Sequence, residues 1–341
     1  MHVELHTQFR QDPAAAEAAG LVSACVHCGF CLATCPTYLD TGDERDSPRG
    51  RIYLLKHLLE TGDGSATAQT HLDRCLTCRS CETTCPSGMQ YGRLADFGRN
   101  LLEQQQPRPL PARGFRWVLR KVLSRPALVT PLLRIGQLLR PLLPAVLRSH
   151  IPAGQKRRPV PATAQARRML VLDGCVQRAA TPGTNDAARR VLHRLGISLV
   201  SAPRAGCCGA LSYHLGAHAE ALHQVRRNID VWWPQIEAGA EAIVSTASGC
   251  GTQLVDYGHL LADDPVYADK ARRVSELARD IGQILVEEDL SRLGGRPAIG
   301  PVAVHTPCSL QHGLGEPGLI ATVLDRAGFE LSATRDQHLC C

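Results

Sequence analysis

Eight cysteines in the first hundred residues form two runs with the same spacing, C-x2-C-x2-C-x3-C-P. The first run holds Cys25, Cys28, Cys31 and Cys35, and the second holds Cys75, Cys78, Cys81 and Cys85. Three closely spaced thiolates can enclose one [4Fe–4S] cluster, while the fourth points away and ligates the other cluster of a two-cluster protein. The spacing therefore predicts one cluster on Cys25, Cys28, Cys31 and Cys85, and a second on Cys75, Cys78, Cys81 and Cys35.

Zinc is the alternative metal, because C-x2-C pairs also bind it. A structural zinc site usually takes its four ligands from two separate pairs, whereas each run here contains four cysteines and is closed by Pro36 or Pro86. The pattern favours iron–sulfur clusters, and with them electron transfer. We expect both prolines to end the ligand loop and to begin a helix.

The other seven cysteines contain a repeat. Cys175 is followed 32 positions later by Cys207-Cys208, and Cys308 is followed 32 positions later by Cys340-Cys341; Cys250 comes after the first pair. Two adjacent cysteines do not readily form a disulfide with each other, but they can present two thiolates to one metal. Buried cysteines that only pack are the alternative reading.

Short apolar runs alternate with helical patterns around this repeat. We expect strands at 169–172, 197–200, 242–245 and 301–304, and helices over 184–195, 216–238 and 318–327. Such alternation favours a parallel α/β sheet. Cysteines that follow strand ends lie where these folds build their sites.

The segment between the two cysteine runs predicts an amphipathic helix over 52–59, with Ser47 and Pro48 as its start signal. Arg49 and Arg51 precede this helix. Either they lie beside a cluster, where positive charge would favour the reduced form, or they are ordinary solvated arginines. The sequence leaves both readings open.

Composition divides the 341 residues into three regions, and the cysteine repeat divides the last of them in two. We expect a two-[4Fe–4S] ferredoxin-like domain over 1–103, a basic connector and linker over 104–168, a first cysteine-rich domain over 169–300, and the start of a second over 301–341. The fold class is thus a helical α+β unit followed by a duplicated α/β unit. The polar N-terminus and the 15 cysteines predict thiols in a reducing cytoplasm, and exclude a small disulfide scaffold.

The connector contains no Asp or Glu between Glu103 and Asp173. Arginines there alternate with leucines and with Phe115 and Trp117, and we expect the prolines to break the segment into short helices. Those prolines are Pro126, Pro131, Pro141 and Pro144. Residues 113–150 suit the surface of an anionic membrane, although a packed connector or subunit contact is an equal alternative. Nucleic acid is disfavoured, because no reading motif accompanies the charge.

Three stretches carry a resemblance to a known family: SACVHCGFCLATCPTY, SPRGRIYLLK and DRCLTCRSCETTCPSG. They resemble the iron–sulfur subunits of bacterial glycolate oxidase, and the architecture is similar to subunits of anaerobic glycerol-3-phosphate dehydrogenase and of lactate-utilisation systems. The resemblance implies an FAD-containing partner subunit that oxidises glycolate to glyoxylate. It also implies electron flow through this chain toward membrane quinone, on the cytoplasmic face of the inner membrane.

The repeat resembles the cysteine-rich CCG domain of heterodisulfide reductase-type subunits, where the motif continues to a C-x-x-C. Here Cys250 matches the second cysteine of that pair and Ala247 stands in place of the first. The resemblance makes Cys175, Cys207, Cys208 and Cys250 candidate ligands, and leaves a conventional four-thiolate cluster, a quinone site and a thiol–disulfide reductase open. Because the second copy stops at Cys340-Cys341, we expect the natural chain to continue.

Overall fold

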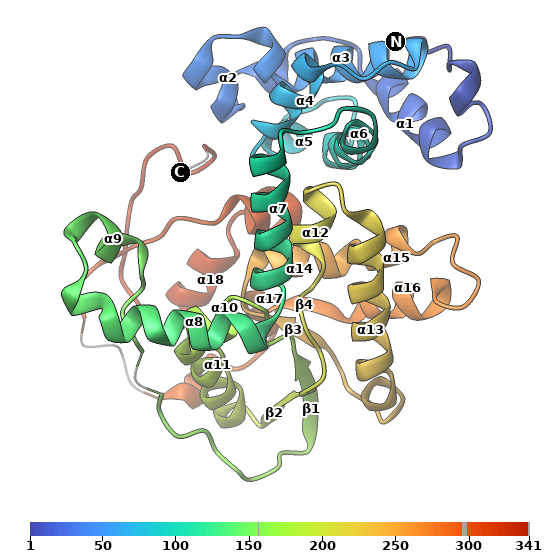
Figure 1. Cartoon of the computed structure of the whole chain (residues 1–341). Helices are drawn as coiled ribbons and strands as arrows, with labels where there is room; N and C mark the ends of the chain where they lie inside the picture. The colour runs from blue at the N-terminus through green and yellow to red at the C-terminus, as the bar shows by residue number, and fades with distance from the viewer. Residues whose placement is uncertain (156, 295–298, 340–341) are drawn as a thin grey trace.

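The chain forms two lobes that are joined by a long helix (Figure 1). The computed structural model describes residues 1–155, 157–294 and 299–339. All regular elements described in the N-terminal lobe are helical. They are η1 Thr7–Phe9, α1 Pro13–Ala24, η2 Phe30–Leu32, α2 Pro36–Thr41, η3 Glu44–Asp46, α3 Pro48–Thr61, α4 Ala66–Asp73, α5 Ser80–Thr83 and α6 Tyr91–Gln105.

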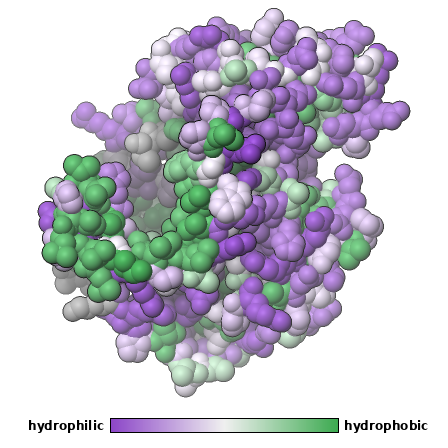
Figure 2. All heavy atoms as spheres, in the orientation of Figure 1, coloured by the Kyte–Doolittle hydropathy of each residue, from purple (hydrophilic) through white to green (hydrophobic). Residues whose placement is uncertain are grey.

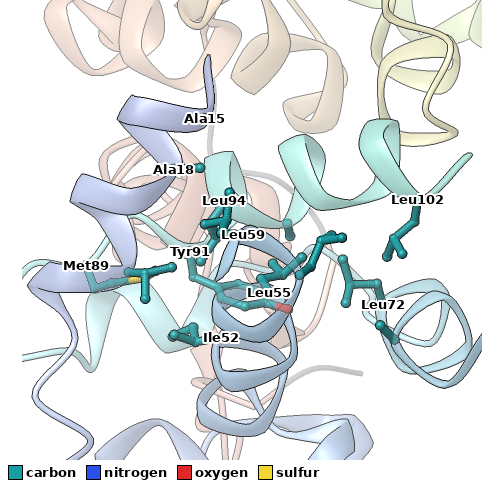
Figure 3. Close-up of a cluster of buried hydrophobic side chains, with 14 of the residues drawn as sticks. Ala15, Ala18, Ile52, Leu55, Leu59, Leu72, Met89, Tyr91, Leu94 and Leu102 are labelled. Carbon is teal, nitrogen blue, oxygen red and sulfur yellow. The ribbon is translucent and has the colours of Figure 1, made fainter. Parts of the chain in front are cut away.

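The N-terminal lobe has one aliphatic core, to which α1, α3, α4 and α6 all contribute (Figure 3). Leu55 and Leu59 of α3 gather there with Leu94 and Leu102 of α6, all of them fully buried. Gly98 of α6 lies where a Cβ would collide with the Leu55 side chain, so glycine permits the close approach of α3 and α6. This core supports the two cysteine loops, which lie between α1 and α2 and between α4 and α6.

Helix α3 begins where the sequence predicted. The Ser47 hydroxyl accepts a hydrogen bond from the Gly50 amide at 3.0 Å, and Pro48 occupies the first helical position. Pro36 begins α2 in the same way.

The matching prediction for Pro86 is wrong. The chain turns after this residue: Gly88 has φ 66° and its amide donates to the Cys85 carbonyl at 3.2 Å. The next helix begins only at Tyr91. A left-handed residue two positions after the proline prevents helix propagation, so the proline closes a turn instead.

The connector forms α7 Leu110–Leu123, α8 Pro126–Leu139, η4 Arg140–Leu142 and α9 Ala145–His150. Pro126 begins α8 as expected, but Pro131 lies inside α8 and does not break it. A proline in a helix interior costs one backbone hydrogen bond. That loss is tolerated on a helix that exposes much of its surface, where water can bind the free carbonyl.

Helix α7 is attached at both ends. Near its start, Arg108 contacts Asp73 and Glu103 of the N-terminal lobe, and Arg116 contacts Asp73 at 2.9 Å. Near its end, Lys121 forms an ion pair with Glu220 of the second lobe at 2.7 Å. These contacts fix the helix that joins the lobes.

The second lobe is built on a parallel sheet with strand order β2-β1-β3-β4. The strands are β1 Arg167–Val171, β2 Ile197–Ser201, β3 Ile243–Ser245 and β4 Ala278–Asp280. The helices are α10 Gln177–Ala180, α11 Pro182–Arg194, α12 Ala210–His214, α13 His218–Glu237, α14 Ser248–Val255, α15 Tyr257–Leu260, α16 Ala268–Leu277 and α17 Ile281–Glu287, followed by η5 Leu290–Leu293. The predicted parallel α/β sheet is confirmed, although β4 was not anticipated.

Both faces of this sheet are covered by helices (Figure 1). Leu170 and Leu172 of the β1 segment enter a core with α13, whereas Met169 and Val171 enter a core with α11 on the other face. Alternate residues therefore fill two cores, which is why the strand reads as a continuous apolar run.

Residues 302–332 repeat the order strand, cysteine, helix, strand. The elements are β5 Val302–Ala303, η6 Ser309–Gly313, α18 Leu319–Arg326 and β6 Leu331–Ser332. Strands β5 and β6 pair in parallel, as β1 and β2 do. Cys308 follows β5 as Cys175 follows β1, and α18 packs against α17. Cys340 and Cys341 lie outside the described residues.

Candidate metal centres

The two cysteine loops of the N-terminal lobe share an unusual backbone conformation. His27 and Gly29 have φ of 55° and 84°, and the equivalent Thr77 and Arg79 have φ of 52° and 59°. A β-branched or bulky side chain rarely adopts positive φ. Its occurrence at the same two positions of each motif shows that both loops curl around a point in the same way.

Each loop curls around a cavity. The first cavity is lined by Cys25, Cys28, Cys31 and Cys85, and by Cys81 at its wall. The second is lined by Cys35, Cys75, Cys78 and Cys81. In each case the last cysteine of one motif lies at the cavity formed by the first three cysteines of the other, and the two cavities share Pro48, Cys81 and Tyr91.

The donor set fits a metal cluster better than free thiols. Burial, with a smaller contribution from the neighbouring Cys25 and Cys28 thiols, raises the pKa of Cys31 to about 11. Burial likewise raises the pKa of Cys81 strongly, with Cys75 adding to the effect. Four thiolates cannot gather in such a place without a counter-charge, which iron would supply.

Two arginines lie against these cavities, so the reading of Arg49 and Arg51 as ordinary solvated residues is wrong. Arg51 is buried, lines the second cavity, and has its Nη1 3.9 Å from the sulfur of Cys35. Arg49 lines the first cavity and donates to the His27 carbonyl at 3.4 Å. Positive charge therefore lies beside each set of thiols.

The charge of Arg51 is balanced by a carboxylate that sequence reasoning missed. Asp46 is fully buried; its Oδ1 lies 3.4 Å from Arg51 and 2.8 Å from His71, and its Oδ2 lies 2.8 Å from Arg74. Arg51 also donates to the His71 carbonyl at 2.7 Å. Asp46 is 25 positions from His71, and no local pattern indicated this network.

In the second lobe, the structure brings together the four cysteines Cys175, Cys207, Cys208 and Cys250, whose side chains contact one another in that order. They reach one edge of the sheet because β1, β2 and β3 are parallel and end there. Contact with Cys175 lowers the pKa of Cys207, but contact with Cys208 and burial outweigh it and raise that pKa to about 12. Cys207 and Cys208 are also buried members of the apolar core on this face of the sheet, and Cys175 and Cys250 pack against it.

The Cys207-Cys208 backbone is held by buried polar side chains that the sequence did not reveal. Asn228 of α13 accepts from the Gly206 amide at 2.9 Å and donates to the Cys207 carbonyl at 2.8 Å. The hydroxyl of Tyr257 donates to the Cys208 carbonyl at 2.8 Å. The sequence signal that could have indicated this role is the position of Asn228 on the apolar face of an amphipathic helix.

Cys308 lies apart from that group. It lines a cavity of about 550 Å³ between the lobes, together with Leu76 and Cys78 of the second cysteine loop and with Gly249, next to Cys250. The cavity therefore lies between the second cysteine loop and α14, the helix that carries Cys250.

Two ion pairs join the lobes around this cavity. Arg79, in the second cysteine loop, donates to Asp256 at 2.7 Å, and both side chains are largely buried. His214 contacts Asp96 of α6 at 2.9 Å. Arg79, which has positive φ in the second cysteine loop, thus also connects that loop to the other lobe.

Replacement of Asp256 with alanine is expected to loosen this junction, because Arg79 loses its partner in a largely buried place. We expect a loss of about 1–2 kcal/mol, seen as a fall of about 2–8 °C in the midpoint of thermal unfolding. Asp269→Ala, which removes an exposed ion pair to Arg272, is the control. Equal shifts in the two variants would show that Asp256 has no special role.

Comparison with known proteins agrees with this architecture. Residues 21–89 match the 4Fe-4S dicluster domain family, and residues 169–255 match the cysteine-rich CCG domain family. The chain is 52% identical to the glycolate oxidase iron-sulfur subunit of Escherichia coli, over all of this chain and 84% of that protein. The chain belongs to the glycolate oxidase iron–sulfur subunit family.

Two further relatives of this glycolate oxidase iron–sulfur subunit family member have lower identity to it. A probable glycolate oxidase iron-sulfur subunit of Bacillus subtilis is 32% identical over 79% of this chain and 66% of its own length. A lactate utilization protein A of Bacillus velezensis is 31% identical over 46% of this chain and 63% of its own. No solved structure matches the chain. Membership confirms the predicted resemblance: this is an iron–sulfur protein of the electron-transfer type.

Proposed function

We propose that this chain carries electrons in a glycolate-oxidising enzyme. It receives them from an FAD-containing subunit that converts glycolate to glyoxylate, and it passes them toward membrane quinone. The observation that carries the proposal is the pair of adjoining cavities, each lined by at least four cysteines that come from both motifs. The names of the Escherichia coli and Bacillus subtilis relatives support glycolate as the substrate of the whole enzyme.

The proposed ligands of the first [4Fe–4S] cluster are Cys25, Cys28, Cys31 and Cys85, and those of the second are Cys75, Cys78, Cys81 and Cys35. The crossed fourth ligand is supported by the lining of the cavities. Bound clusters would supply the one-electron redox chemistry. The chain itself supplies the thiolates and the nearby charges of Arg49 and Arg51, which favour the more anionic reduced state.

We further propose a third metal centre on Cys175, Cys207, Cys208 and Cys250. Its support is the mutual contact of these thiols and the polar side chains that hold their backbone. The cavity that contains Cys308 lies between this group and the second cluster cavity. This arrangement favours a route through the second cluster to the sheet lobe.

The iron content tests these assignments together. The full chain is expected to hold about twelve irons, from three four-iron centres, with matching sulfide. The Cys207→Ser/Cys208→Ser variant is expected to retain about eight, because the ferredoxin-like cysteines are untouched. Zinc in place of iron would contradict the cluster assignment. Eight irons in both proteins would contradict only the proposed third centre.

The substrate of the whole enzyme needs a separate experiment. The partner subunit is co-purified with this chain from native cells, and its oxidation of glycolate, lactate and glycerol phosphate is assayed.

The connector supports a membrane-surface contact as part of this function. No described helix has the length and apolar character needed to cross a membrane. Helices α8 and α9 nevertheless expose many apolar side chains, which form the continuous hydrophobic area on the left of Figure 2. We propose that this face rests on the membrane that holds the quinone.

A further inference from the structure

The connector and the sheet lobe together line a cavity that the route of electrons does not use. Its volume is about 730 Å³, within the range of ligand sites. The start of α8, the loop at 203–206 after β2, α10 and α13 form its walls. Six arginines line it: Arg125, Arg134, Arg157, Arg178, Arg204 and Arg227.

These arginines have few counter-charges. Arg157 forms an ion pair with Asp186 at 2.8 Å. Within the described parts of the chain, no ion pair to a carboxylate involves the other five, and no acidic residue is among those that line the cavity. Arg227 lies so close to Gly206 that a side chain at that position would displace its guanidinium. Six cations around one hollow repel each other, and a bound anion would relieve that cost.

The backbone that lines the cavity also carries partial positive charge. Residues 125–128, at the N-terminal end of α8, form part of its wall. The first turn of a helix carries partial positive charge and free amide groups. Guanidinium groups bind phosphate oxygens through paired hydrogen bonds. A phosphate group is thus the anion that best matches this site.

An apolar surface begins at the rim of the cavity. Leu128 lines the cavity and is 42% exposed, and the apolar area continues from it along α8, η4 and α9. Its other members are Leu132, Ile135, Leu138, Leu139, Leu142, Val146 and Leu147, all exposed. This is the same hydrophobic area that Figure 2 shows. The ligand therefore has an anionic head and an apolar tail.

We infer that the arginine cavity binds the phosphate headgroup of an anionic phospholipid, whose acyl chains lie against α8 and α9. The inference rests on the proposed membrane contact and adds to it a defined lipid site. Four of the six arginines lie outside residues 113–150, namely Arg157, Arg178, Arg204 and Arg227. The positive charge of the site therefore does not come from the amphipathic helices alone.

Flotation with vesicles of equal parts phosphatidylglycerol and phosphatidylcholine tests the inference, at about 0.15 M salt, where exposed charges are largely screened. The Arg178→Gln/Arg204→Gln variant of the full chain is expected to bind at least tenfold more weakly than the wild type. The matched control is Arg113→Gln/Arg148→Gln, which removes the same charge from α7 and α9 but outside the cavity. We expect it to weaken binding less than threefold.

Equal weakening in the two variants would overturn the lipid site and leave only general surface charge. Displacement of the wild type by millimolar inorganic phosphate would also overturn it, because the ligand would then be a soluble phosphate. If the wild type does not float with these vesicles, the membrane contact fails as well. Iron content measured on the same samples reports separately on the electron-transfer function. Should the double variant lose iron, Arg134→Gln, on α8 and away from the cysteines, is expected to show the same tenfold loss.

Discussion

Replacement of Cys85 with serine is expected to abolish the spectroscopic signal of the cluster held by Cys25, Cys28 and Cys31, although Cys85 belongs to the other motif. Its side chain lies at the first cavity, and the second cavity is lined by four other cysteines. Loss of one of four thiolates removes or converts a cubane cluster. EPR of the reduced protein, with iron analysis, measures the change.

The reciprocal variant gives the same test in the opposite direction. Cys35→Ser is expected to remove the signal of the cluster on Cys75, Cys78 and Cys81, and to leave the first cluster intact. Cys308→Ser, a cysteine at neither cluster cavity, is the control and should alter neither signal. If Cys85→Ser changes only the cluster of its own motif, the ligands are not crossed.

Replacement of Asp46 with asparagine is expected to be the most destabilising change outside the cysteines. The fully buried carboxylate contacts Arg51, His71 and Arg74, so the amide would leave the buried Arg51 without its carboxylate partner. Breaking a buried ion pair in this way costs about 3–5 kcal/mol. Because Arg51 Nη1 lies 3.9 Å from the Cys35 sulfur, the second cluster should also be lost faster on exposure to air.

The measurement is chemical unfolding followed by circular dichroism, together with the decay of cluster absorbance. Asp43→Asn is the matched control, since it removes a carboxylate from the same short segment that pairs with exposed Arg45. We expect the control to unfold like the wild type. Similar behaviour of the two variants would mean that the buried network contributes nothing beyond surface charge.

Low pH should act on the same network. Burial raises the pKa of Asp46, but the hydrogen bonds from His71 and Arg74 outweigh it and hold that pKa below its usual value. A depressed carboxyl pKa contributes stability that is present above the unfolded value, near pH 4, and is lost as the pH falls through the folded value. The Asp46→Asn variant should therefore lose less stability between neutral and acid pH than the wild type.

The sequence predicted those features that depend on local spacing. The cysteine runs, the Ser47-Pro48 helix start and the strands around the CCG repeat all follow from patterns within about ten residues. The resemblance to the CCG domain also predicted that Cys175, Cys207, Cys208 and Cys250 belong together, and the parallel strands bring them to one edge of the sheet. Local chemistry was misleading at Pro86 and Pro131, where the surrounding backbone decided the outcome.

What could not be predicted depends on contacts between distant segments. Arg51 donates to the Thr37 hydroxyl of α2 and to the His71 carbonyl of α4, which are 14 and 20 positions away. Arg79 looked like one more residue of a ligand loop, yet its partner Asp256 is 177 positions away. Asn228 stands out only by its place on the apolar face of α13, and its partners in the Cys207 loop are about 20 positions away. No periodicity reveals such pairs.

The attachment of α7 at both ends has a consequence for the rate of electron transfer. Arg116 joins this helix to Asp73 and Glu103 of the N-terminal lobe, and Lys121 joins it to Glu220 of the sheet lobe. The ion pair of Arg79 with Asp256 links the two lobes directly. Electron tunnelling slows steeply with distance, so a carrier whose parts swing must wait for a close approach. We expect these contacts to hold the second cysteine loop at a nearly constant separation from the cysteines of the sheet lobe. Transfer from the second cluster to the proposed third centre should then depend on the difference in potential and be insensitive to the viscosity of the solvent.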